Sequence, residues 1–293
     1  MATLRDIRRR IGSVKNTQQI TRAMKMVSAA KLNRAQTAVK EAQPYAAQLR
    51  QMVTTLSKGT SGDDHPLFNT QNQGKTRIIL FTSDKGLCGT FNSGLLRALI
   101  REMEKSNGPM ADPELVVIGR TGNDAMKNSG FLVKEALVNV KPVDIQGEVK
   151  IRIQQAAQDF SEGRIGRVFL AYNTFLSPLK QNPTLHQILP IEPAEPSKEG
   201  GAKDGEEQTA EYIYEPDRDE ILNRLLPHYL ENQGFTAMLN TVAGEHGARM
   251  VAMEAATKNA GEMIRRLTLQ YNRVRQAAIT RELIEIINGA QSL

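Results

Sequence analysis

A glycine-containing turn is the first stretch of this sequence whose residue types could do chemistry. The segment TSDKGLCGTFNSG, residues 82–94, joins an expected strand to an expected helix and carries three glycines. Backbone N–H groups of such a turn can bind phosphate at a helix N-terminus. The segment matches neither GxGxxG nor GxxxxGK[ST], so we favour a structural turn over a phosphate site.

Histidine and cysteine form no pattern typical of an active site. The four histidines are scattered, and none pairs with a cysteine or a carboxylate at the spacing of metal ligands. The single cysteine, Cys88, excludes an internal disulfide and fits a reducing compartment. A small buried residue is the favoured interpretation of Cys88 over a nucleophile. The sequence therefore predicts no catalytic residue, no bound cofactor and no metal site in this chain.

The elements around the turn predict an α/β domain. Short apolar runs rich in β-forming residues alternate with helical segments between residues 75 and 191. The runs are 77–84, 115–120 and 167–175, the helical segments follow residue 89 and cover 149–163, and 184–190 is an expected edge strand. Such alternation predicts a Rossmann-like, parallel-type sheet covered on both faces. Residues 192–210, rich in Pro, Gly and Glu, are expected to be a solvated loop.

Long helices are predicted at both ends of the chain. From Thr3 to Gln43 there is no proline, and Pro44 is expected to end or kink a helix that resumes to Ser57. Helical spacing also continues from His228 to Ile287, which corresponds to roughly 90 Å of helix. A compact chain of this size has a diameter of about 50 Å. The C-terminal helix must therefore project, and it needs a partner around it.

The economical arrangement pairs the two helices as an antiparallel coiled coil with the α/β domain inserted between them and lying at its base. The coil is formed by residues 1–58 and 211–293, with a seam of Ala, Met, Ser and Thr rather than Leu and Ile. The segment ITRAMKMVSAAKL, 20–32, has apolar residues around its circumference, so we expect it to contact both its partner helix and another molecule. The longer C-terminal helix should expose its last apolar residues, Leu283, Ile284, Ile286 and Ile287.

The net charge of +6 is unevenly distributed. Residues 1–58 contain twelve Lys and Arg but only two acidic residues, Asp6 and Glu41. This segment predicts an acidic partner, which could be nucleic acid, anionic lipid or an acidic protein surface. No apolar run approaches the ~18–20 residues of a spanning helix, and the N-terminus lacks the apolar core of a signal peptide. We therefore expect a soluble chain.

The ends of the chain resemble the γ-subunit family of bacterial F-type ATP synthases. The resemblance is carried by LRDIRRRIGSVKNTQQITRAMKMVSAAKL (4–32), ARMVAMEAATKNA (248–260) and YNRVRQAAITRELIEIINGA (271–290), and it extends to TSDKGLCG and YIYEPD. The resemblance implies the central rotor shaft of the proton-translocating enzyme. In that role the chain couples rotation of the c-ring to conformational cycling of three catalytic β subunits in ATP synthesis and hydrolysis.

The resemblance also implies contact residues, which we carry over position by position. Met24 matches a position near an acidic lever segment of β, and Lys25 and the surrounding cations suit that acidic partner. A solvated basic face is the alternative for each of these cations. Arg249, Arg275, Gln276 and Thr280 match the region that meets a β loop, and an intramolecular salt bridge is the alternative for these positions. The tip residues Leu283, Ile284 and Ile287 would turn within an apolar collar of the αβ ring. Tyr212, Tyr214 and Glu215 match the region that faces the c-ring.

Partners and location follow from the same resemblance. The expected partners are an α3β3 hexamer, the ε subunit and the c-ring, with one copy of this chain per complex and no nucleic acid. ATP, ADP and Mg²⁺ would be bound by partner subunits, so the chain itself is expected to be non-catalytic. The expected location is the cytoplasmic face of the bacterial plasma membrane, reached through the complex only. The alternative function is that of a basic coiled-coil nucleic-acid-binding protein, although no aromatic residues interleave its cations for base stacking.

Overall fold

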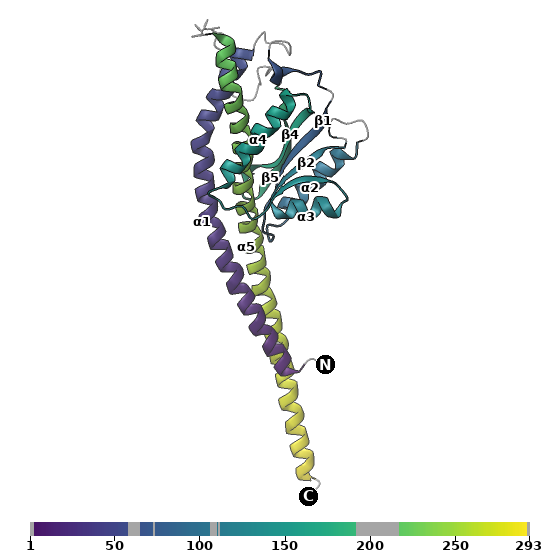
Figure 1. Cartoon of the computed structure of the whole chain (residues 1–293). Helices are drawn as coiled ribbons and strands as arrows, with labels where there is room; N and C mark the ends of the chain where they lie inside the picture. The colour runs from purple at the N-terminus through teal and green to yellow at the C-terminus, as the bar shows by residue number, and fades with distance from the viewer. Residues whose placement is uncertain are drawn as a thin grey trace.

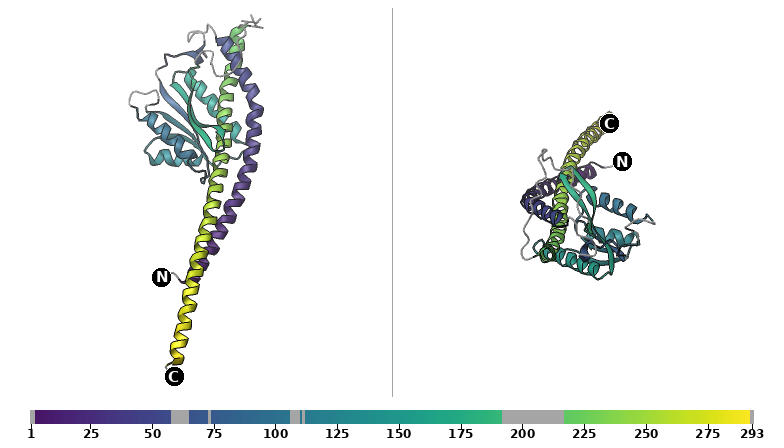
Figure 2. Two further views of the ribbon diagram at one scale, coloured as in Figure 1. Left: turned by 180° about the vertical axis from the view of Figure 1, so that it is seen from behind. Right: turned by 90° about the horizontal axis from the view of Figure 1, so that it is seen from above.

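Two long antiparallel helices carry an α/β domain on one side (Figure 1). The computed structural model describes residues 3–57, 65–72, 74–105, 110, 112–191 and 217–291. Helix α1 spans Leu4–Ser57 and helix α5 spans Arg218–Gln291. The end of α1 and the start of α5 lie beside the domain, and the C-terminal part of α5 extends beyond the N-terminus of α1 (Figures 1 and 2). The antiparallel pairing predicted from the sequence is confirmed.

The domain contains a five-stranded sheet in the order β3-β2-β1-β4-β5. The strands are β1 (Lys75–Phe81), β2 (Glu114–Ile118), β3 (Val133–Leu137), β4 (Ile165–Ser177) and β5 (Lys180–Leu189). Strands β1 to β4 are parallel to their neighbours, and β5 pairs with β4 in the antiparallel sense at the edge. The three predicted inner strands and the predicted edge strand are confirmed. The sequence analysis did not predict β3.

Helices cover both faces of this sheet, as predicted. Helices α2 (Phe91–Met103) and α3 (Arg120–Asn128) lie on one face, and α4 (Ile145–Ser161) and α5 lie on the other (Figure 1). Side chains alternate between faces along a strand, so β1 supplies both cores. One core contains Ile78 and Leu80 of β1 with Leu95, Leu99 and Met126, and the other contains Ile79 and Phe81 with Ile153, Phe160 and Leu226.

Two prolines lie inside the long helices, and neither ends its helix. Pro44 lies inside α1, which was expected to end or kink there, and Pro227 lies inside α5, which starts ten residues before the predicted His228. A proline removes a backbone donor from a helix, but contacts on the flanking turns can hold the helix together. Leu49 and Val53 follow Pro44, and Leu226 and Leu230 flank Pro227, and all four are buried. At 74 residues, α5 is roughly 110 Å long.

Small and flexible residues form the seam between the two helices, as predicted. The Thr21 and Thr257 hydroxyl oxygens lie 2.8 Å apart, and the amide nitrogen of Gln18 donates to the Thr257 carbonyl at 3.3 Å. Ser28 and Met253 are also buried. The predicted solvated loop, 192–210, lies outside the described residues.

Candidate functional site

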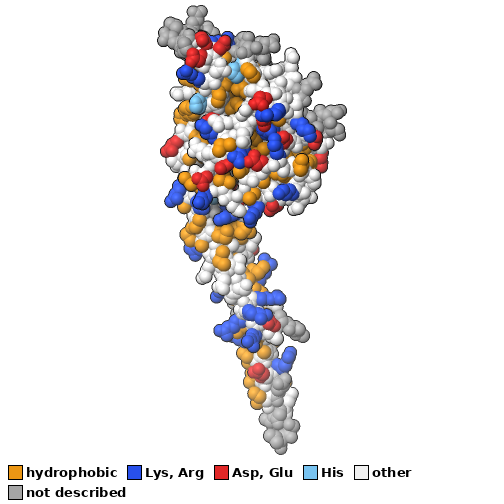
Figure 3. Space-filling view, viewed as in Figure 1, with side chains coloured by type: hydrophobic (Ala, Val, Ile, Leu, Met, Phe, Trp, Pro, Cys, Tyr) orange, Lys and Arg blue, Asp and Glu red, His pale blue; other side chains and the backbone are white. Residues whose placement is uncertain are grey.

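The tip of α5 is an exposed helix with uncovered apolar side chains. Beyond Gly261 most residues of α5 are exposed. Leu283, Ile284, Ile286 and Ile287 are 54%, 52%, 68% and 54% exposed. Leu283, Ile284 and Ile287 are spaced three and four residues apart, so they lie on one face of the helix. Figure 3 shows hydrophobic side chains on the surface of this tip.

A polar group lies about one helical turn before this apolar face along α5. Arg275, Gln276 and Thr280 are all exposed on α5. The Thr280 hydroxyl donates to the carbonyl oxygen of Gln276 at 3.0 Å, whereas the Arg275 guanidinium and the Gln276 amide face solvent. Positions 276 and 280 are neighbours on one helix face, and Arg275, next to Gln276 in sequence, lies at the side of that face. Two exposed side chains are therefore available to another molecule.

Met24 and Lys25 lie on α1 at the middle of the coiled coil. Lys25 makes a cross-helix ion pair with Glu254, with 2.7 Å between its Nζ and the carboxylate oxygen. Met24 is half-buried, whereas Met26 and Val27 are exposed. The prediction that segment 20–32 has one face toward its partner helix is confirmed, and contact of its other faces with another molecule stays a prediction.

The cationic end of α1 lies where α5 leaves the coiled coil. Arg5, Arg8, Arg9 and Arg10 are exposed there, and Figure 3 shows Lys and Arg side chains gathered at this level of the shaft. Asp6 is the acidic residue nearest to them, and its carboxylate accepts hydrogen bonds from Thr3, which lower the pKa of Asp6. This part of the shaft is therefore strongly positive and open to an acidic surface.

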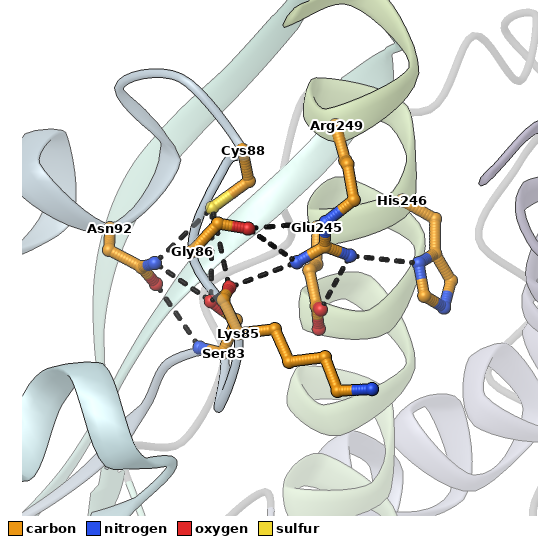
Figure 4. A network of polar contacts seen from close by, with 8 residues as sticks. All are labelled: Ser83, Lys85, Gly86, Cys88, Asn92, Glu245, His246 and Arg249. Carbon is orange, nitrogen blue, oxygen red and sulfur yellow. Dashed lines mark hydrogen bonds and ion pairs between the residues drawn. The ribbon is translucent and has the colours of Figure 1, made fainter. Parts of the chain in front are cut away.

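Arg249 lies apart from the exposed group, inside the molecule. Its side chain is buried, and its Nη1 is 2.8 Å from a carboxylate oxygen of Glu245, one turn earlier on α5. Its Nη2 donates to the carbonyl oxygens of Lys85 and Gly86, at 2.9 and 3.2 Å, in the glycine-containing turn after β1 (Figure 4). A contact between this turn and this arginine could not be predicted from the sequence, because they are 163 positions apart.

The glycine-containing turn has its own polar interior. The Asn92 side chain accepts from the Ser83 amide at 3.1 Å and donates to the Ser83 hydroxyl at 2.8 Å and to the Cys88 sulfur at 3.3 Å (Figure 4). Cys88 is buried, as the sequence suggested. Toward α5 the turn presents carbonyl oxygens to a guanidinium, which is the opposite polarity from a phosphate-binding loop. This geometry favours the structural interpretation of residues 82–94.

His246 completes the surroundings of Arg249. Burial, together with the nearby positive charges of Arg249 and Lys31, lowers the pKa of His246 to about 4. At neutral pH the imidazole is therefore uncharged. Its Nδ1 lies 3.5 Å from Nη1 of Arg249, so a neutral ring can accept from the guanidinium without adding a third positive charge.

The described residues contain neither a metal-ligand cluster nor a membrane-spanning helix. In the described part of the chain, no three His, Cys, Asp or Glu side chains gather as metal ligands would. No helix among these residues is long and apolar enough to cross a membrane. Tyr212, Tyr214 and Glu215, predicted to face the c-ring, lie outside the described residues.

Fold and surface together define a class of protein: an elongated shaft of two antiparallel helices with an α/β domain attached at one end and a bare apolar tip at the other. A family model described as ATP synthase matches residues 3–293. The ATP synthase gamma chain of Geotalea daltonii is 46% identical over 100% of this chain and 99% of its own length. That of Pelotomaculum thermopropionicum is 41% identical over all of both chains.

This chain therefore belongs to the ATP synthase gamma chain family and has that family's function of central rotor shaft. A solved structure of the Euglena gracilis mitochondrial ATP synthase contains a chain of the same fold, with a TM-score of 0.68 and 18% identity over 99% of this chain and 94% of that one. A second Euglena gracilis structure, of the rotor, gives a TM-score of 0.63 at 18% identity, with coverage of 94% and 98%. These matches give no support to the nucleic-acid-binding alternative.

Proposed function

We propose that this chain turns as a single copy inside a ring of α and β subunits and transmits rotation to them without supplying a catalytic group. The observation that carries the proposal is the bare tip of α5, whose apolar side chains have no cover within the described chain. Exposed apolar surface on a projecting helix needs a surrounding protein. Contact between apolar surfaces is non-directional, so an apolar collar can hold the tip at every angle of rotation.

The shaft would act on the ring because its two helices are not symmetric about the axis of rotation. Three β subunits surround one shaft, so each meets a different face of the same two helices. A face that favours one conformation of β shifts the population of that subunit toward it, and rotation moves the preference to the next subunit. The shaft supports this because its two helices expose different side chains at one level: Met26 and Val27 on α1, and Glu254 on α5.

Directional contacts would be made by the exposed group on α5. The planar guanidinium of Arg275 can hold a carboxylate of a β loop in one rotary position and release it in the next. Gln276 and Thr280 would extend the same hydrogen-bonding patch, and Met24 and Lys25 would meet an acidic segment of β. The resemblance assigns Arg249 to the β-loop contact too, but its guanidinium is bound within this chain, so we place the direct contact at Arg275 and Gln276.

The remaining partners lie at the domain end of the shaft. We propose that the α/β domain, with residues Tyr212, Tyr214 and Glu215, faces the ε subunit and the c-ring. Nucleotides and Mg²⁺ would be bound by the α and β subunits and not by this chain. The chain would then be held at the cytoplasmic face of the bacterial plasma membrane through the complex alone.

Reconstitution tests this proposal. The purified chain, mixed with α and β subunits of the same source, should form a stable complex that hydrolyses ATP, whereas the chain alone should not. Replacing Arg275→Ala together with Gln276→Ala should lower ATP synthesis by the assembled enzyme by about tenfold, since hydrogen bonds to charged groups contribute about 1.5–3 kcal/mol each. The matched control is Arg224→Ala, an exposed arginine at the other end of α5. Equal activity of the double variant and the control would contradict the assigned contact.

A further inference from the structure

Three glycines of α5 let the α/β domain approach the helix backbone more closely than any side chain would allow. A Cβ atom at Gly244 would lie 2.7 Å from Cε2 of Phe91, and one at Gly247 would lie 3.1 Å from the Cα of Pro178. A Cβ atom at Gly234 would lie 2.8 Å from Cγ1 of Ile153. These contacts form a notched surface on α5, here called the seat, which fits the domain at residues 234–247.

Hydrogen bonds join the domain to the shaft at the C-terminal end of the seat. The Asn240 side-chain oxygen accepts from the backbone amide of Phe175 in β4 at 3.0 Å. Arg249 donates through Nη2 and Nε to the carbonyl oxygens of the turn after β1. The turn after β1 and strand β4 are thereby both held to one stretch of α5, from Asn240 to Arg249.

The turn held by Arg249 has a backbone conformation that needs support. Leu87 has a φ of 62° although it carries a side chain, and it is 65% exposed, so its own packing does not hold it in place. A residue in this region persists only when its surroundings determine its conformation. The carbonyls of Lys85 and Gly86, directly before Leu87, are the acceptors of the Arg249 guanidinium (Figure 4).

The position of this contact in the sheet is also informative. The turn follows β1 at the point where the strand order reverses between β1 and β4, and open α/β sheets bind their ligands in the crevice there. In this chain a guanidinium from its own long helix lies against that turn. Glu245 is paired with the buried positive charge, and the neutral His246 adds no competing charge.

We propose that Arg249 is a positioning residue that locks the turn after β1 onto α5 and so fixes the rotational position of the α/β domain about the shaft. The glycine seat gives the shape of the joint, and the arginine prevents sliding, because one planar fork reaches two carbonyl oxygens at once. Torque that passes between the domain and the exposed part of the shaft crosses this joint. That consequence rests on the proposed function, whereas the lock itself does not.

Hydrogen exchange on the purified full chain tests the lock without reference to rotation. The reporters are the amides of Ser83, bonded to the Asn92 side chain, and of Phe91, bonded to the Cys88 carbonyl. In Arg249→Gln these two amides should exchange about tenfold faster, because the buried charged hydrogen bonds are lost. Amides of α4, which contacts α5 at Gly234, about four helical turns before Arg249, should keep their rates within about twofold.

Three further variants make the result decisive. Arg249→Lys should release the turn almost as fully as Arg249→Gln, since an ammonium group lacks the fork. Glu245→Gln keeps the guanidinium and should accelerate the same amides less, which provides the test if Arg249→Gln does not fold. Arg266→Gln is the matched control, an exposed arginine on the same helix. Unchanged exchange at Ser83 and Phe91 in the folded variants, or equal acceleration throughout α4, would overturn the proposal.

Discussion

One helix, α5, has two halves with opposite environments. From Leu222 to Ala260 it is packed against α1, α4 and the sheet, and the described side chains from Gly261 to Asn288 are largely exposed. Glycines that would weaken an isolated helix lie in the packed half, against neighbours in the domain, while isoleucines and a leucine lie bare in the other half. Residue type alone therefore does not identify the buried part of a long helix, because burial depends on which elements pack against it.

The largest difference should appear when a leucine is truncated in each half. Leu226 is fully buried in the core shared by α4, the sheet and α5, so Leu226→Ala should lower the free energy of unfolding by about 2–5 kcal/mol. Leu283→Ala at the tip should change it by less than about 0.5 kcal/mol. Urea unfolding of the isolated chain, followed by circular dichroism, measures both. Equal losses would show that the tip is packed in solution and would remove the distinction between the halves.

Replacing a glycine in each half of α5 should give a smaller difference in the free energy of unfolding. Gly→Ala in a helix interior is worth about 1 kcal/mol in propensity. At Gly244 the new methyl group would meet the buried ring of Phe91, so we expect a net loss of about 1–3 kcal/mol from overpacking. At Gly261 the nearest atom, 3.0 Å away, is the amide nitrogen of Gln18, the end of a flexible side chain, so Gly261→Ala should not destabilise the chain. Thermal unfolding of the two variants measures the difference, and a stabilised Gly244→Ala would contradict the close fit of the seat.

These contacts also show what could be predicted from the sequence. The long helices, their antiparallel pairing, the α/β domain and the exposed tip followed from helical spacing and length, which are local properties. The role of the α5 glycines did not follow, because Phe91, Pro178 and Ile153 are distant in sequence. Strand β3 was missed because VKEAL carries Lys134 and Glu135 and lies at an edge of the sheet, where charged side chains are tolerated.

The residues of the candidate site also differ in how far the sequence predicts their contacts. Exposure of Arg275, Gln276 and Thr280 follows from their position beyond the end of α1, and a resemblance of sequence motifs was enough to select them. The internal contact of Arg249 could not be predicted, because its acceptors are two backbone carbonyl oxygens of a turn. Every residue has a backbone carbonyl, so residue type does not identify such an acceptor. The available signal was an arginine between small and apolar residues, Gly247, Ala248, Met250 and Val251, because a charge in such surroundings needs a partner if it is buried.

The smallest expected effect is a pH dependence that arises only in the packed half. Burial, Arg249 and Lys31 lower the pKa of His246 to about 4, below its usual 6.5, so between these values the unfolded chain binds a proton that the folded chain does not. Stability that is fully present above pH 6.5 is therefore lost progressively as the pH falls toward 4. Replacing His246→Gln removes the titrating group and keeps an oxygen that can accept from Arg249.

The measurement is the midpoint of urea unfolding between pH 7.5 and pH 4.5 for the native chain and for His246→Gln. Carboxylates such as Asp159, whose pKa is lowered by Arg77 and Arg164 against the effect of its burial, titrate in both proteins and cancel in the difference. The native chain should lose more stability over this interval than the variant. His228→Gln, an exposed histidine on the same helix with a carboxylate neighbour, is the control and should follow the native chain. Parallel curves for His246→Gln and the native chain would contradict this prediction. They would mean that the imidazole is hydrated or displaced from Arg249, and that α5 is less tightly packed there than the structure shows.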